Sequence, residues 1–265
     1  MKRFNFGKRA LMAASGVALA LGMASAHAVP QFTINPSALG LGGPAGPITA
    51  DAIGGTSSEL LHTFGNTHEG QGWLSYSSFR LNSANLKANE TGLNFNYGIY
   101  VKFTLKDHVS SGVINTPNSV NTLDQLDFTM WADPGNANIF TAATLGTEAS
   151  IAGEADDIQL GFGKLNSGTS SFNNLFGAAL NANTDFELTA DGKLFFVGPV
   201  PFYDMTFNGF NNTTQGAAID DAGNIAINDA SGTTDFNRVP EPGSLALLAL
   251  GLLGVHAVNR RRQDA

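Results

Sequence analysis

The chain has 265 residues, no cysteine and a formal net charge of −8 at pH 7 with histidine neutral. Without cysteine the protein forms no disulfide bond, so its stability must come from a packed core. The acidic balance argues against nucleic acid as a partner, and against anionic polymers unless a cation bridges the two. Charged residues make up only 14% of the chain, and 31 residues are glycine. This composition is consistent with a domain that is rich in strands and turns.

The N-terminal segment has the pattern of a secretory signal peptide. Four basic residues precede an apolar stretch, Ala10–Met23, which is too short to favour a permanent membrane span. Small side chains follow this stretch, and Ala26 and Ala28 suit signal peptidase. We therefore expect signal peptidase to cleave after Ala28. An uncleaved N-terminal anchor is the alternative.

Alternation of apolar and polar residues is the main structural signal of the central region. Its clearest instance runs from Phe95 to Leu105, where every second side chain is strongly apolar. This period of two predicts a strand with one face turned to a core. The pattern leaves Phe172–Leu180 open between a short helix and a strand. Further strands are predicted at Glu59–Phe64, Trp73–Phe79, Leu126–Met130, Ile158–Phe162, Phe186–Leu188 and Met205–Phe207, with a final hairpin over Ala217–Asn237.

The expected fold class is all-β, because turn-forming segments such as Asp-Pro-Gly, Asn-Ser-Gly and Asp-Gly separate these short strands. We predict a single β-sandwich of the jelly-roll type. About 210 residues between the terminal segments are enough for one sizeable core.

Two predicted turns concentrate oxygen-bearing side chains, which makes them candidates for calcium binding. Calcium takes about six to eight oxygen ligands and tolerates the geometry of loops. Neither turn contains a complete Asp-x-Asp-x-Asp-Gly loop, so solvated turn residues and a protein without any cofactor are the alternative. The candidate ligands are Asp133, Asn136 and Asn138 in one turn and Asp156 and Asp157 in the other.

Two aromatic residues are candidates for stacking on sugar rings, which they contact through apolar and dispersion interactions. They are Trp73 and Tyr100. Tyr100 lies on the polar side of the Phe95–Leu105 strand, so we expect its ring to point outward. Packing of that ring against a second sheet or a loop is the alternative.

The sequence offers no convincing catalytic set, and we predict that the protein is not an enzyme. It has no cysteine nucleophile, no Gly-x-Ser-x-Gly elbow and no His-Glu-x-x-His motif. His62 and His68 together suggest a metal site, but exposed loop histidines are the simpler interpretation. The pair Asp107 and His108, at a predicted strand end, has the same interpretation. A glycosidase would need two acids at a separation and burial that sequence does not reveal.

The C-terminal segment combines three features in order. An apolar run, Leu245–Val258, spans roughly 21 Å as a helix at about 1.5 Å per residue, against a hydrocarbon core of about 30 Å. With its neighbours it predicts a short transmembrane helix whose following arginines stay on the cytoplasmic side. An ordinary buried helix is the alternative. The features are Pro240, Glu241 and Pro242; the helix Ser244–Val258; and Arg260, Arg261 and Arg262.

This tail resembles the PEP-CTERM sorting signal, which has the same three parts in the same order. The resemblance implies that Pro240, Glu241 and Pro242 are recognised by an exosortase, a membrane protease-transpeptidase, and perform no chemistry themselves. It also implies a Gram-negative-type cell that makes exopolysaccharide. The protein would be anchored transiently in the inner membrane and would end at the cell surface or in the extracellular matrix. Because the helix is short, we interpret the tail as a removable address.

Segments of the central region are similar to flocculation-associated PEP-CTERM proteins, in the same order along the chain. The resemblance covers most of Gln31–Asn237. It implies an exported matrix or surface protein that promotes cell aggregation together with exopolysaccharide. A lectin-like module that binds carbohydrate, with or without calcium, is the alternative. The similar segments are Gly54–Glu59, Gly92–Tyr100, Trp131–Asn136, Ala155–Asp157 and Phe186–Phe207.

These interpretations divide the chain into three parts. We predict a signal peptide over 1–28, a β-sandwich ectodomain over 29–237 and a PEP-CTERM sorting signal over 238–265. The ectodomain is thus flanked by a signal helix and by a transmembrane helix.

Overall fold

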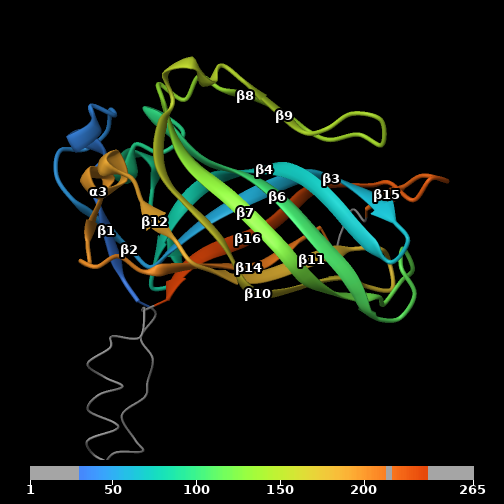
Figure 1. Ribbon diagram of the computed structural model, residues 1–265. Coiled ribbons are helices and arrows are strands. Elements are labelled where there is room, and N and C mark those ends of the chain that lie inside the picture. Colours follow the sequence, from blue (N-terminus) through green and yellow to red (C-terminus); the bar gives the residue numbers. More distant parts are fainter. Residues whose placement is uncertain (1–29, 213–216, 238–265) are drawn as a thin grey trace, which may run out of the picture. The chain divides into compact units, whose positions relative to one another are not determined.

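The computed structural model describes residues 30–212 and 217–237. Within these ranges, eight long antiparallel strands form a closed β-barrel (Figure 1). Each barrel strand pairs with its neighbours in chain order, and β16 pairs with β3 to close the ring. The barrel strands are β3 (Ala52–Phe64), β4 (Thr67–Leu81), β6 (Tyr97–Ser111), β7 (Val120–Pro134), β10 (Ile158–Phe172), β11 (Ala178–Thr184), β14 (Asp204–Asn211) and β16 (Ile225–Asn237).

Shorter elements occupy the connections between barrel strands. Strands β1 and β2 pair with each other, and β1 also pairs with β13, which gives a small separate sheet. The short strands are β1 (Phe32–Ile34), β2 (Ile48–Ala50), β5 (Ala84–Asn85), β8 (Ile139–Thr141), β9 (Ser150–Ala152), β12 (Glu187–Leu188), β13 (Phe196–Gly198) and β15 (Ala218–Ile219). The helices are η1 (Pro36–Leu39), α2 (Ala88–Thr91), η2 (Glu154–Asp156) and α3 (Ala190–Phe195).

The prediction of a mostly β fold is confirmed, but the β-sandwich is wrong. Both architectures bury one face of each strand, so the same alternation of apolar and polar residues suits either one. The barrel differs from a sandwich in two strand pairings, β3 with β16 and β10 with β11. These pairings close the sheet into a ring. Strands β3 and β4 have 13 and 15 residues, longer than the segments expected from sequence.

Strand β6 has the phase that its alternation predicts. Tyr97, Ile99 and Val101 are buried, and their neighbours at even positions face outward. Phe95 is the exception, because it precedes the strand in a turn and is 76% exposed. The undecided segment Phe172–Leu180 contains no helix; it is the turn between β10 and β11 with the strand ends on either side.

A cluster of phenylalanines fills the end of the barrel near the small sheet. The rings of Phe32 and Phe236 are 4.7 Å apart, and those of Phe196 and Phe202 are 4.8 Å apart. Such aromatic pairs add about 0.5–1.5 kcal/mol each beyond the area that they bury. The cluster therefore joins β1, β13 and β16 into one core.

Residues 135–157, here called the arm, leave the barrel between β7 and β10. The arm contains the hairpin of β8 and β9 and lies along the outside of the barrel (Figure 1). A second apolar cluster holds it there: Ala143 of the arm packs with Leu60 of β3 and Ala226 of β16. The outward faces of these strands are thus partly covered by a segment of the same chain.

No helix in the described ranges is long and apolar enough to span a membrane. The predicted signal peptide and the predicted C-terminal helix lie outside the described residues.

Candidate functional site

The base of the arm is fixed to the barrel by aromatic contacts. The Phe140 ring lies 5.1 Å from the Trp73 ring and 5.6 Å from the Tyr100 ring, both edge to face. Trp73 Nε1 also donates to the Thr141 carbonyl oxygen at 3.0 Å. Tyr100 lies on the outer face of β6, but the arm covers it so that it is only 1% exposed; this is the alternative in which the ring packs against a loop. Stacking of Trp73 and Tyr100 on sugar stays a prediction, since in this structure both rings pack on Phe140.

An open groove runs between the arm and the outer faces of β4, β6, β7 and β10. It consists of two hollows of about 760 and 520 Å³, which share Gln71 and Thr104 and therefore adjoin. Phe162 in the first hollow is 43% exposed, and Phe64 in the second is 60% exposed. The groove thus presents apolar rings beside amide and hydroxyl groups along its length.

Ion pairs across or beside the groove supply its charges. Lys102 Nζ lies 2.8 Å from Glu154 Oε1, which joins β6 to the arm. His62 Nε2 lies 2.7 Å from Glu148 Oε1 and joins β3 to the arm tip. The hydrogen bond to Glu148 raises the pKa of His62, so the charged form of this pair is favoured. Both contacts hold the arm down while leaving the groove open to solvent.

The side chains of this groove are of kinds that recognise ligands by hydrogen bonding and by stacking. Carboxylate, amide, hydroxyl and ammonium groups offer both donors and acceptors to the hydroxyl groups of a ligand. Exposed aromatic rings suit the apolar faces of sugars. An extended groove with alternating groups of these kinds fits a linear polymer better than a compact small molecule.

The structure brings together three of the five predicted calcium ligands. Asp133 accepts hydrogen bonds from the backbone amides of Ala137 and Asn138, at 3.0 and 2.9 Å. Asn138 Nδ2 donates to Asp157 Oδ2 at 2.8 Å. Burial raises the pKa of Asp157, and the nearby charges of Asp133 and Glu154 add to the effect. The cluster orders the base of the arm.

The other two predicted ligands point elsewhere. Asn136 donates to the Asn94 carbonyl oxygen at 3.3 Å, and Asp156 is exposed. In the described part of the chain, no group of three or more His, Cys, Asp or Glu side chains is arranged to hold a metal. Calcium binding therefore stays a prediction. It rests on carboxylate and amide oxygen atoms.

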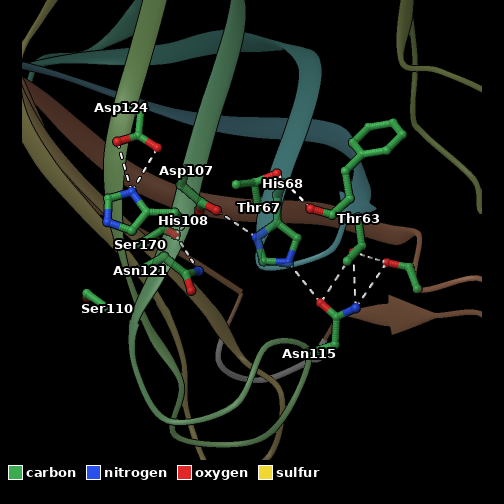
Figure 2. A network of polar contacts seen from close by, with 12 residues as sticks. Thr63, Thr67, His68, Asp107, His108, Ser110, Asn115, Asn121, Asp124 and Ser170 are labelled. Atoms are coloured by element: carbon green, nitrogen blue, oxygen red, sulfur yellow. Dashed lines mark hydrogen bonds and ion pairs between the residues drawn. The ribbon is translucent and has the colours of Figure 1, made fainter.

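A polar network lies near the other end of the barrel (Figure 2). His68 is completely buried, so its interpretation as an exposed loop histidine is wrong. Its Nδ1 lies 2.6 Å from Asp107 Oδ1, and its Nε2 lies 2.8 Å from Asn115 Oδ1. Asp107 also accepts a hydrogen bond of 2.5 Å from Ser170. The serine contacts the carboxylate and not the imidazole, so this is not the geometry of a serine-hydrolase triad.

A small cavity of about 50 Å³ adjoins this network inside the barrel. Its walls are mostly apolar, but Glu59 and Asp107 line it as well. Burial, followed by the negative charge of Asp107, raises the pKa of Glu59 to about 8. Glu59 is therefore mostly protonated at neutral pH, as an acid in an apolar cavity should be.

The amino-acid pattern contains partial signals for some of the site residues that it did not single out. Continuing the alternation of β6 past Leu105 places Asp107 on the inward face. The same alternation places Lys102 and Thr104 on the outer face. Phe140 carried no such signal, because its role depends on how the arm folds back. The alternation of Ile158, Leu160 and Phe162 places Phe162 on the core face, and this phase is wrong. The pairing of β10 with β7 shifts register between Gln159 and Gly161, and Phe162 is 43% exposed.

A comparison with known families identifies the C-terminal segment. Residues 238–262 match the PEP-CTERM protein-sorting motif. Searches of curated proteins and of solved structures gave no match. The sorting motif implies that the protein is exported. More particularly, it carries the motif of proteins that an exosortase processes and that are sorted to the cell surface.

Proposed function

We propose that this protein is an adhesive component of the extracellular matrix that promotes cell aggregation by binding exopolysaccharide. The observation that carries the proposal is the long open groove beneath the arm, with exposed Phe162 and Phe64 beside polar side chains. A matrix polymer is a linear chain of sugars, and a groove open along its length admits such a chain without needing its end.

The charge of the groove favours a neutral polymer. Its lysines are paired with acids, since Lys102 contacts Glu154 and Lys106 contacts Glu69. An anionic polymer would meet these acids and an acidic protein as a whole, and would need a bridging cation.

Isothermal titration of the purified exported protein with the cells' own exopolysaccharide tests the proposal. We expect saturable binding that Phe162→Ala weakens about tenfold, since the lost aromatic contact contributes roughly 1.4 kcal/mol. Phe95→Ala is the matched control, because Phe95 is also exposed but does not line the groove. Absence of binding, or an equal loss in both variants, would contradict the groove as the site.

Flocculation tests the same proposal in cells. Replacing the gene by the Phe162→Ala version should disperse flocs while polysaccharide secretion continues, and the Phe95→Ala version should not. Normal flocs with Phe162→Ala, at equal protein level, would sink the adhesive role of the groove.

A calcium-dependent lectin is the second candidate. It is favoured by two buried oxygen atoms, Asn138 Oδ1 and Asp157 Oδ1, which have no hydrogen-bond partner within the described residues. Titration with calcium and with a chelator separates the two candidates. Polysaccharide binding that is unchanged by both reagents would rule out the calcium-dependent form.

A further inference from the structure

Three distant segments of the chain meet beside the buried His68. They are the end of β3 at Thr63, the loop after β6 at Asn115 and the turn before β16 at Gly223 (Figure 2). Asn115 has a φ of +58°, in the left-handed region that few residues other than glycine adopt. A side chain at Gly223 would come within 2.9 Å of Asn115 Nδ2, so only glycine permits this approach.

Hydrogen bonds fix the orientation of the Asn115 amide. Its Nδ2 donates to the Gly223 carbonyl oxygen at 3.3 Å and to Thr63 Oγ1 at 3.0 Å. A carbonyl oxygen only accepts, so the nitrogen must face Gly223 and the amide oxygen must face His68. His68 Nε2 therefore carries a hydrogen and donates it to Asn115 Oδ1 at 2.8 Å.

The other ring nitrogen of His68 faces a carboxylate. Nδ1 lies 2.6 Å from Asp107 Oδ1, which accepts its hydrogen. With a hydrogen on each nitrogen, the imidazole is cationic and its charge is balanced by Asp107. A cationic donor on an amide oxygen draws electron density from the amide carbon and stabilises negative charge that develops on the oxygen.

The Thr63 hydroxyl is placed against that same amide group. Its oxygen lies 3.0 Å from Asn115 Nδ2 and 3.4 Å from Asn115 Oδ1, so it faces both atoms bonded to the amide carbon. Its hydrogen is held by the Gly223 carbonyl oxygen at 2.5 Å. The nucleophilic hydroxyl and the imidazole that would stabilise the oxyanion are thus each within hydrogen-bond distance of the amide that contains the electrophilic carbon.

We propose that Thr63 and Asn115 form an intramolecular ester crosslink. Thr63 Oγ1 attacks Asn115 Cγ, and a C–O bond forms while the bond from Cγ to Nδ2 breaks. The hydroxyl proton moves to Nδ2, and ammonia leaves. His68 donates to Asn115 Oδ1 throughout and keeps its own proton. The reaction needs no oxidant and no further reagent.

The crosslink would tie the end of β3 to the loop between β6 and β7 in a chain that contains no cysteine. It would close a loop between residues 52 positions apart. A covalent tie of this kind persists in any redox environment, unlike a disulfide bond.

Tandem mass spectrometry of the exported protein, isolated from its cells and digested with trypsin, tests the proposal. Thr63 lies in the peptide that ends at Arg80, and Asn115 lies in the peptide Asp107–Lys164. We expect these two peptides to be joined, with a mass about 17 Da below their sum because ammonia is lost. Mild alkali should separate them by hydrolysing the ester. A succinimide at an asparagine loses the same mass but joins no peptides.

Variants identify the atoms. Thr63→Val should abolish the joined peptide, whereas Thr63→Ser, which keeps a hydroxyl, should retain it. Thr67→Val is the matched control, because the Thr67 hydroxyl only donates to the Phe64 carbonyl. His68→Gln should lower the joined fraction at least about tenfold in protein with an unchanged circular dichroism spectrum. Two separate peptides of full mass from the wild-type protein would overturn the proposal, as would a joined peptide in Thr63→Val.

Discussion

The Glu59 carboxyl group ties the stability of the barrel to pH. Its folded-state pKa is about 8, against an ordinary value of 4.5. The folded state therefore holds this proton more strongly than the unfolded state does. The stabilisation is complete below pH 4.5 and is lost as pH rises towards 8. Glu59→Gln should remove this loss, and urea unfolding should show the variant more stable at pH 8 by on the order of 2–4 kcal/mol.

Protonation of His68 also stabilises the folded state, and this stabilisation is also lost as pH rises. Burial alone would lower its pKa, but hydrogen bonds to Asp107 and Asn115 together outweigh burial and raise it. Its contribution is present below its ordinary pKa of 6.5 and is lost above that value. Measurements at pH 5 and pH 6.5 therefore isolate Glu59. Equal slopes for wild type and Glu59→Gln over this interval would contradict the raised pKa of Glu59.

At the scale of single residues, the sequence predicts the chemical type of a site side chain better than it predicts the surroundings of that side chain in the fold. The sequence predicts calcium ligands of the oxygen type at Asp133 and Asn138 in one turn and at Asp157 in another, and the structure brings the three into contact. Whether such oxygens bind calcium or satisfy backbone amides depends on the path of the arm, which no local pattern encodes. His68 was placed in solvent because its neighbours are polar and glycine-rich, but its position on the inward face of β4 buries it.

One exposed ion pair, His62 with Glu148, acts at the tip of the arm beside the apolar cluster of Ala143. The two side chains are 40% and 36% exposed, so the pair contributes only about 0–1 kcal/mol. Glu148→Gln should leave the unfolding midpoint unchanged but speed amide hydrogen exchange in the arm up to about fivefold. The effect should be largest below pH 6.5 and fade as pH rises through the raised pKa of His62.

A matched control is Glu90→Gln, which breaks the exposed Lys87–Glu90 pair away from the arm. Exchange in the arm should be the same for this control and for wild type. If Glu148→Gln also leaves the arm unchanged at pH 6, the pair does not hold the arm.

Phe140 should matter more to the arm than the ion pair does. It packs on Trp73 and Tyr100 at the base, where the arm buries Tyr100 and covers part of the half-buried Trp73. The chain has two tryptophans, so Trp131→Phe leaves Trp73 as the only tryptophan fluorophore. In that background Phe140→Ala should shift the emission maximum to longer wavelength. Ile139→Ala is the control, since Ile139 is 67% exposed; an equal shift in both, or none, would contradict this packing.

At the level of elements, the period-two pattern gave strand identity and phase but not strand ends. Strand β6 continues beyond Leu105, the end of the clear alternation, because it pairs with β4 as far as His108 and with β7 as far as Ser111. The segment after Phe186 was expected as a strand and a turn, but it forms the short helix α3. The Thr189 side chain caps this helix by accepting a hydrogen bond from the Gly192 amide.

At the scale of the whole molecule, barrel and sandwich differ in long-range pairings that sequence alternation does not encode. The strands β3 and β16 are far apart in the chain, yet Leu61 pairs with Ile225 and Ala52 with Asp235. An open sheet would leave both strands with a free edge, at which a second chain can pair and aggregate. Closure removes that liability for the barrel strands.

The sorting motif predicts how the whole molecule is released. Pro240, Glu241 and Pro242 lie within the matched residues 238–262, and an exosortase processes proteins that carry this motif. Glu241→Ala removes the only charge between the two prolines, so the enzyme loses a group that it can recognise by hydrogen bonds or charge. We expect the variant to keep its C-terminal residues to Ala265 and to remain with the membrane fraction, as intact mass and fractionation would show.

The control for this prediction is Glu187→Ala, which removes an exposed acid of the ectodomain and leaves the motif unchanged. It should be processed like wild type, because the fold and the motif are both intact. Release of Glu241→Ala with the same C-terminal mass as wild type would show that this acid is not read. Recognition by the exosortase would then rest on other residues of the matched segment 238–262.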